Sequence, residues 1–139
     1  MSENTTVRDL SEFIPKEGNE IHDVEKLKDA TDEELKPFTD QLIKWLDNRS
    51  YPVTKEVTEI LAKHPEIISD SIIKVLDKEQ GNEEWKVNVI QELIPKIDGG
   101  ANEAVVQALM RLVRRPTIEE STDGPCAEAK IYLQSINRY

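Results

Sequence analysis

The sequence contains little cysteine and histidine, and each shortage excludes a class of protein. Its one cysteine, Cys126, excludes an internal disulfide and is typical of a reducing compartment. The two histidines, His22 and His64, occur without any His-x-x-x-His or Cys-x-x-Cys spacing, so we predict no metal site. Catalysis by Cys126 would need a base that no motif supplies. We therefore expect no cofactor and no enzyme activity.

Long apolar runs are also absent. No segment approaches the roughly 20 apolar residues that cross a bilayer. The first six residues are polar and acidic, unlike the start of a signal peptide. We expect a cytoplasmic protein that does not bind membranes.

Basic charge is scarce relative to acidic charge. The chain has 28 Asp and Glu against 18 Lys and Arg, which gives a net charge of −10. Residues 1–47 hold 13 acids and 6 bases, a net charge of −7, so the acidity is concentrated there. An acidic surface repels nucleic acid and attracts basic proteins, although solubility alone is the alternative explanation. Arg111, Arg114 and Arg115 fit the C-terminal end of a helix dipole better than a nucleic-acid site.

The most informative feature present in the sequence is a repeated six-residue motif. The segments 42–47 and 72–77 read LIKWLD and IIKVLD, and a looser copy, LMRLVR, spans 109–114. Each copy ends a predicted helix that a second helix follows. A period of roughly 30–40 residues built from helix pairs is typical of an α-solenoid. We predict an all-α, HEAT/armadillo-like α-solenoid of about three helix pairs behind a short N-terminal helical cap.

Start and stop signals divide this single domain, residues 1–139, into segments. The Thr31-Asp32-Glu33-Glu34 segment has a capping-box pattern, and Pro52 and Pro65 occupy positions typical of a helix start. Asp23 is expected to cap a short helix in the N-terminal region. The predicted segments are the cap, 1–30, the helix pairs, 31–64, 65–98 and 101–137, and a polar loop, 117–125.

Six short motifs are spread over residues 10–97: Ile14-Pro15-Lys16, His22-Asp23, Trp45-Leu46, Pro52-Val53, Trp85-Lys86 and Ile94-Pro95. In their order and spacing they resemble a small family of uncharacterised bacterial proteins with HEAT-like repeats. Tyr51 departs from the family pattern, which has Trp at this position. The resemblance implies the helical fold and no established activity. It also implies a role as an immunity protein, since similar proteins lie among bacterial toxin and immunity genes.

Three functional hypotheses follow. The first is a non-enzymatic protein-binding module, in which solvent-facing residues on the second helix of each pair bind a basic partner. In a more specific form of this hypothesis, the chain is an immunity protein that neutralises a basic toxin. The second is a small-ligand-binding protein or weak enzyme with a pocket near the N-terminal cap, using His22 and Asp23. The third is a structural homo-oligomer. For the oligomeric state we expect a monomer or a weak homodimer. The predicted partner-binding residues are Lys55, Glu56, Glu59, Asn88, Gln91, Glu92, Glu128 and Gln134.

Overall fold

The computed structural model describes residues 9–77 and 83–139, and throughout these ranges the chain is helical with no β-strand. The prediction of an all-α protein is confirmed for this part of the chain. None of its helices is long and apolar enough to cross a membrane.

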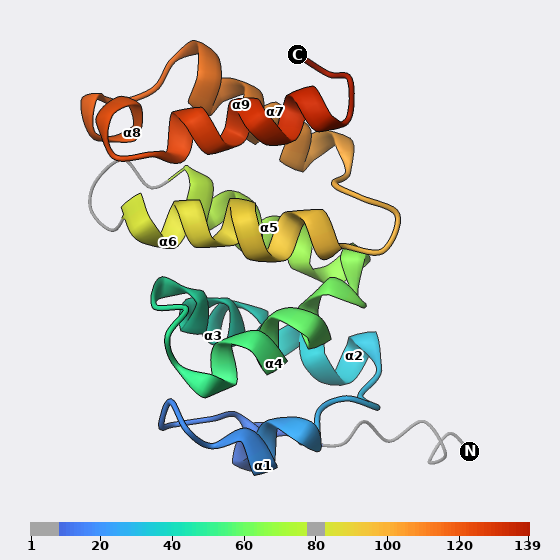
Figure 1. Cartoon of the computed structure of the whole chain (residues 1–139). Helices are drawn as coiled ribbons and strands as arrows, with labels where there is room; N and C mark the ends of the chain where they lie inside the picture. Colours follow the sequence, from blue (N-terminus) through green and yellow to red (C-terminus); the bar gives the residue numbers. More distant parts are fainter. Residues whose placement is uncertain (1–8, 78–82) are drawn as a thin grey trace.

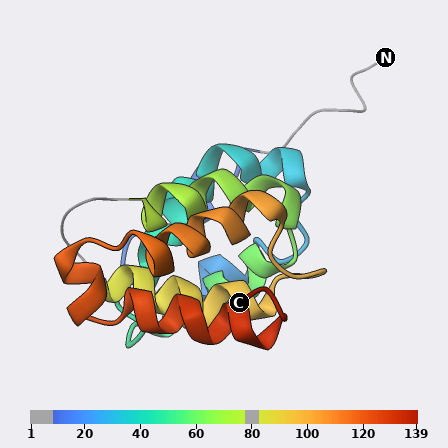
Figure 2. The same cartoon turned by 90° about the horizontal axis from the view of Figure 1, so that it is seen from above.

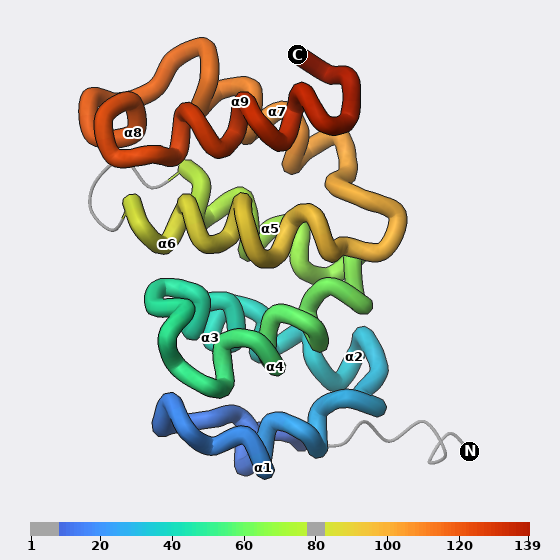
Figure 3. Tube along the Cα trace, viewed as in Figure 1, coloured from blue at the N-terminus to red at the C-terminus, as the bar shows by residue number. Residues whose placement is uncertain are grey.

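The helical elements follow one another with short connections (Figure 3). The elements within residues 9–77 are η2 (Ser11–Phe13), α1 (Ile21–Glu25), α2 (Asp32–Leu35), η3 (Lys36–Phe38), α3 (Thr39–Ile43), η4 (Lys44–Asp47), α4 (Pro52–Ala62) and α5 (Pro65–Leu76). Those within residues 83–139 are α6 (Glu83–Asn88), η5 (Val89–Leu93), η6 (Ile94–Lys96), α7 (Glu103–Arg114), α8 (Ile118–Thr122) and α9 (Pro125–Ser135). Four of the described short elements, η2, η3, η4 and η6, are 3-10 turns, and η5 is a π-helical turn.

Successive helices stack in order along the molecule, from α1 at one end to α9 at the other (Figure 1). The helices α3, α5 and α7 contact one another in sequence, and α4, η5 and α9 form a second series of contacts. Viewed along the stack, the two series form neighbouring rows (Figure 2). The core lies between these rows and consists mainly of buried Leu, Ile and Val.

The predicted helix starts are confirmed. Thr31 accepts a hydrogen bond from the Glu34 amide while the Glu34 carboxylate accepts one from the Thr31 amide, so the capping box is complete. Pro52 and Pro65 are the first residues of α4 and α5, where a missing N–H costs nothing.

The helix that follows α6 changes its hydrogen bonding before Pro95. The Ile94 amide donates to the Val89 carbonyl five residues earlier, which makes η5 a π-helical turn. Pro95 has no N–H to give to Gln91, and its ring would clash with that carbonyl in a regular α-helix. The wider turn accommodates the proline while Ile90, Leu93 and Ile94 stay buried.

Two sequence predictions about local structure were wrong. The polar segment 117–125 is not a loop, because Thr117 and Glu120 form a second capping box that starts α8. Asp23 does not cap α1; it lies inside this helix, and the N-cap position belongs to Glu20.

Candidate partner-binding groove

The predicted partner-binding residues lie on the second row of helices, α4, α6–η5 and α9, but they are unequally exposed. Lys55, Gln91 and Gln134 are exposed, and the four glutamates are half-buried. Gln91 and Glu128 come together across a groove of about 490 Å³ between η5 and α9. Nothing in this arrangement identifies a ligand, so the row stays a predicted binding surface.

Asn88 was wrongly predicted to face solvent. Its side chain is only 1% exposed, and its Nδ2 donates to the Leu46 carbonyl at 2.8 Å. The carbonyl belongs to η4, whose last turn leaves it without a helical partner. The buried amide therefore joins two neighbouring layers of the stack.

Two glutamates of the predicted row are neutralised by basic side chains of the same chain. Lys28 lies 3.2 Å from Glu56, and Arg49 lies 3.3 Å from Glu92. Arg49 also donates to the Gln91 side-chain oxygen at 2.7 Å. These contacts lower the net negative charge of the row, so its acidity is weaker than the sequence suggested.

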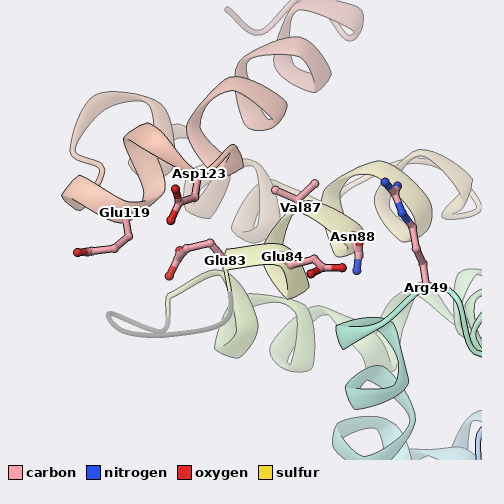
Figure 4. Close-up of a pocket in the computed structure, with 7 residues that line it drawn as sticks. All are labelled: Arg49, Glu83, Glu84, Val87, Asn88, Glu119 and Asp123. Carbon is pink, nitrogen blue, oxygen red and sulfur yellow. The ribbon is translucent and has the colours of Figure 1, made fainter.

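A more acidic surface lies next to this row, in a groove of about 600 Å³ between α6 and α8. The groove is lined by carboxylates from both helices, with a single cation, Arg49, among its lining residues. Figure 4 shows Glu83, Glu119 and Asp123 gathered at one end, and Glu84 beside Asn88 toward the other. The complete lining is Arg49, Glu83, Glu84, Val87, Asn88, Glu119 and Asp123, and we name this cavity the α6–α8 groove.

Two buried side chains of the α6–α8 groove have unused hydrogen-bonding capacity. Within the described residues, neither carboxylate oxygen of Glu83 accepts a hydrogen bond, and the Oδ1 of Asn88 accepts none. Glu83 Oε2 lies 3.1 Å from the Lys86 ammonium, which balances its charge without a well-directed hydrogen bond. Buried acceptors are usually paired, so the groove presents acceptors that a bound donor would satisfy.

A buried charge network holds α8 against the rest of the protein. The Glu120 carboxylate is fully buried and accepts hydrogen bonds from Lys86 at 2.7 Å and from Arg111 at 2.6 Å. It also accepts the Thr117 amide at 2.8 Å, and Arg111 in turn donates to the Leu76 carbonyl at 2.7 Å. The network links α5, α6, α7 and α8, and so fixes the two walls of the groove.

The network keeps Glu120 ionised. Burial alone would raise its pKa, but hydrogen bonds from Arg111, Lys86 and the Thr117 amide lower the pKa from 4.5 to about 2. The hydrogen bond to Glu120 raises the pKa of Arg111. Glu120 and Arg111 are therefore both charged at neutral pH.

A separate cavity of about 430 Å³ lies where the N-terminal segment meets α3 and η4. Its wall includes Trp45 and Tyr51, whose rings meet edge to face with centroids 5.4 Å apart. A pocket near the cap was predicted, but His22 and Asp23 do not line it. The remaining lining residues are Ile14, Pro15, Lys16, Gln41, Lys44 and Asp47.

The other candidate chemical groups do not assemble into a site. Among residues 9–77 and 83–139, no group of three or more His, Cys, Asp or Glu side chains is arranged to hold a metal ion. Cys126 is a half-buried free thiol in the first turn of α9. His64 precedes α5, with its Nδ1 at 2.5 Å from Asp32 Oδ1.

The sequence carried a signal for the groove that our prediction missed. Thr117-Ile118-Glu119-Glu120 repeats the capping-box pattern recognised at Thr31 and therefore predicts α8. Its polar composition led to its assignment as a loop. The pairing of Glu120 with Lys86, in contrast, joins residues far apart in the sequence and has no local signal.

Comparison with known proteins places the chain in a family. Residues 13–132 match the family described as Domain of unknown function (DUF5071), and the chain belongs to this family. A search among curated proteins found no match.

Proposed function

We propose that this DUF5071 protein is a non-enzymatic module that binds a basic protein partner through the α6–α8 groove. One observation carries the proposal: four carboxylates and a buried amide with an unused acceptor line a groove that contains a single cation. Arg49, that cation, already interacts with Gln91 and Glu92 outside the acidic end.

Charge favours such a partner at long range as well as in contact. The net charge of −10 steers basic proteins toward the chain, and the steering weakens as salt screens it. The predicted row of second-helix residues lies next to the groove, because Arg49 lines the groove and donates to Gln91 and Glu92 of the row. A partner seated on both would meet glutamates and amides from α4, η5 and α9.

The proposed architecture is a HEAT-like array whose second helices provide the recognition surface. The ordered contacts of α3, α5 and α7, and of α4, η5 and α9, support this assignment. Its sharper functional form is an immunity protein that neutralises a basic toxin. A toxin nuclease suits this form, because an acidic inhibitor presents the kind of charge that its nucleic-acid substrate presents.

The experiment is capture of partners from a lysate of the source organism at low and high salt. The test variant reverses three exposed groove charges, Glu84→Lys, Glu119→Lys and Asp123→Lys. A matched control changes the net charge equally at exposed acids outside the groove, Glu33→Lys, Glu66→Lys and Asp70→Lys. Glu66 and Glu119 both lie in the first turn of a helix, so the control also matches the loss of a favourable dipole interaction.

We expect the wild type and the control to retain one stoichiometric basic protein at low salt, and the groove variant to lose it. Equal retention by the groove variant would contradict the proposal. Circular dichroism of all three proteins checks that each is folded.

A second candidate function is binding of a small ligand in the cavity near the cap. Trp45 and Tyr51 in its wall favour it, because a planar ligand gains from stacking on aromatic side chains. A ligand that binds the native state raises its thermal stability. A panel of aromatic compounds that raises the melting temperature of the wild type, but not of Trp45→Ala, would support this function.

Self-association is the third candidate. Ile131 is 58% exposed on α9 and Ile118 is 78% exposed on α8, so the last helices present apolar side chains to solvent. Light-scattering mass over a range of concentrations tests it. A mass that stays at one chain excludes the homo-oligomer.

A further inference from the structure

The chemistry of the α6–α8 groove suggests which basic side chain it receives. We propose that the groove binds an arginine of the partner, whose guanidinium donates to the Asn88 amide oxygen and to the Glu84 carboxylate. This inference rests on the proposed function, and it specifies the group that is recognised.

The orientation of the Asn88 amide is determined by its surroundings. Its Nδ2 donates to the Leu46 carbonyl at 2.8 Å, and the reverse orientation would place two oxygens against each other. The Oδ1 is therefore the amide atom that is left for a ligand, and Asn88 is among the residues that line the groove. Among the described residues this oxygen accepts no hydrogen bond, although Asn88 is only 1% exposed.

Glu84 supplies the second acceptor of the proposed site. Its side chain is exposed, and Figure 4 shows its carboxylate beside Asn88. The proposal requires a side-chain rearrangement at the groove, because the Asn88 Oδ1 is itself buried in this structure. Glu84 and Asn88 are four residues apart on one helix, so they project from the same face.

The chain already binds a guanidinium with the same pair of acceptor types. Arg49 donates to the amide oxygen of Gln91 at 2.7 Å and to the carboxylate of Glu92 at 3.3 Å. In Figure 4 Arg49 lies at the opposite end of the groove from Glu83, Glu119 and Asp123. Arg49 directs these hydrogen bonds to Gln91 and Glu92 and, among the described residues, donates none to Glu84 or to the Asn88 Oδ1.

A guanidinium fits this acceptor set better than an ammonium. Its five N–H groups lie in one plane and can address an amide oxygen and a carboxylate together, whereas an ammonium is compact and more strongly hydrated. Burial of the ligand next to half-buried Val87 favours the more weakly hydrated cation. The exposed carboxylates of Glu119 and Asp123 add attraction for any cation, so the discrimination depends on Glu84 and Asn88.

The test is a nuclear magnetic resonance titration of the full 15N-labelled chain with N-acetyl-arginine methylamide. The matched probes are N-acetyl-lysine methylamide, which has the same charge, and N-acetyl-citrulline methylamide, which is a neutral isostere of the arginine compound. The reporter is the side-chain NH2 of Asn88, assigned by its loss in Asn88→Asp. It lies on the recognised amide and responds to a donor at Oδ1.

We expect the arginine probe to shift the Asn88 NH2 and the backbone amides of α6 and α8. The lysine probe should bind at least about fivefold more weakly, and the citrulline probe should leave these signals unchanged. Glu84→Gln should weaken arginine binding by about fivefold or more, while Glu66→Gln should leave it unchanged. These variants keep the size of the side chain, so they test the charge without disturbing the fold.

Equal shifts from lysine and arginine would overturn the guanidinium assignment and leave the proposal of a basic partner standing. The same conclusion holds if neither probe shifts Asn88 but the groove variant still loses the captured partner. If neither probe binds and the groove variant retains the partner, both the inference and the proposed function are wrong.

Discussion

Replacing Lys86 by methionine tests the buried charge network that supports the groove. The Lys86 side chain is 1% exposed, and its ammonium lies 2.7 Å from Glu120 and 3.1 Å from Glu83. Methionine keeps most of the apolar volume but removes the charge, so two buried carboxylates lose this cation. Removing one partner of a buried ion pair costs about 3–5 kcal/mol, a large part of the stability of an ordinary domain.

Glu120→Gln removes the negative charge of the same ion pair. It leaves Lys86 with Glu83 and removes the charge that Arg111 faces, so we expect a loss of about 3 kcal/mol. In the double variant the carboxylate of residue 120 is no longer left as an unpaired buried charge, and only Glu83 still lacks Lys86. Its loss should therefore be smaller than the sum of the single losses by about 1–3 kcal/mol.

The assay is urea unfolding of the wild type, the two single variants and the double variant, followed by circular dichroism. Constant slopes against urea would show that only stability has changed. Single losses below about 1 kcal/mol that add in the double variant would refute the reasoning, because exposed pairs behave in that way.

The same comparison predicts a pH dependence. The pKa of Glu120 is lowered from 4.5 to about 2 in the folded protein, so its ionised form stabilises the fold above pH 4.5. This contribution, about 3 kcal/mol at neutral pH, is lost as the pH falls from 4.5 to about 2. The difference in unfolding free energy between wild type and Glu120→Gln should shrink over this range, and a constant difference would contradict the assigned pKa.

Three further substitutions probe local structure, each measured by urea unfolding. Thr31→Ala removes the cap of α2 and should cost about 1 kcal/mol, whereas Thr31→Ser should cost little. Gly124→Ala places a Cβ at 3.0 Å from Val87 at a φ of +119°, so it should cost more than about 1 kcal/mol. Trp85→Phe removes the indole hydrogen bond to the Ile43 carbonyl, 3.0 Å long, and should cost about 1 kcal/mol. No measurable loss in any of these would contradict the contact concerned.

Local patterns predicted the helical framework well. The capping box at Thr31 and the prolines at the starts of α4 and α5 act within a few residues, so the sequence displays them directly. The segment 117–125 shows the limit of composition, because its polar character obscured a cap that its pattern revealed.

The candidate groove depended on contacts that no local pattern records. Asn88 is buried because η4 presents the Leu46 carbonyl to it, and Glu120 is buried because Lys86 and Arg111 compensate its charge. The predicted row of binding residues was built on helical spacing alone. It therefore included Asn88 and omitted Glu84, Glu119 and Asp123.

The affinity of the captured partner for wild type and for the triple groove variant tests the central claim most directly. Isothermal calorimetry at several salt concentrations measures it, with the Glu33→Lys, Glu66→Lys and Asp70→Lys protein as the control. Recognition in the α6–α8 groove predicts that wild type and control bind with an affinity that falls with salt, and that the groove variant binds at least about tenfold more weakly. Equal affinities for all three proteins would contradict it.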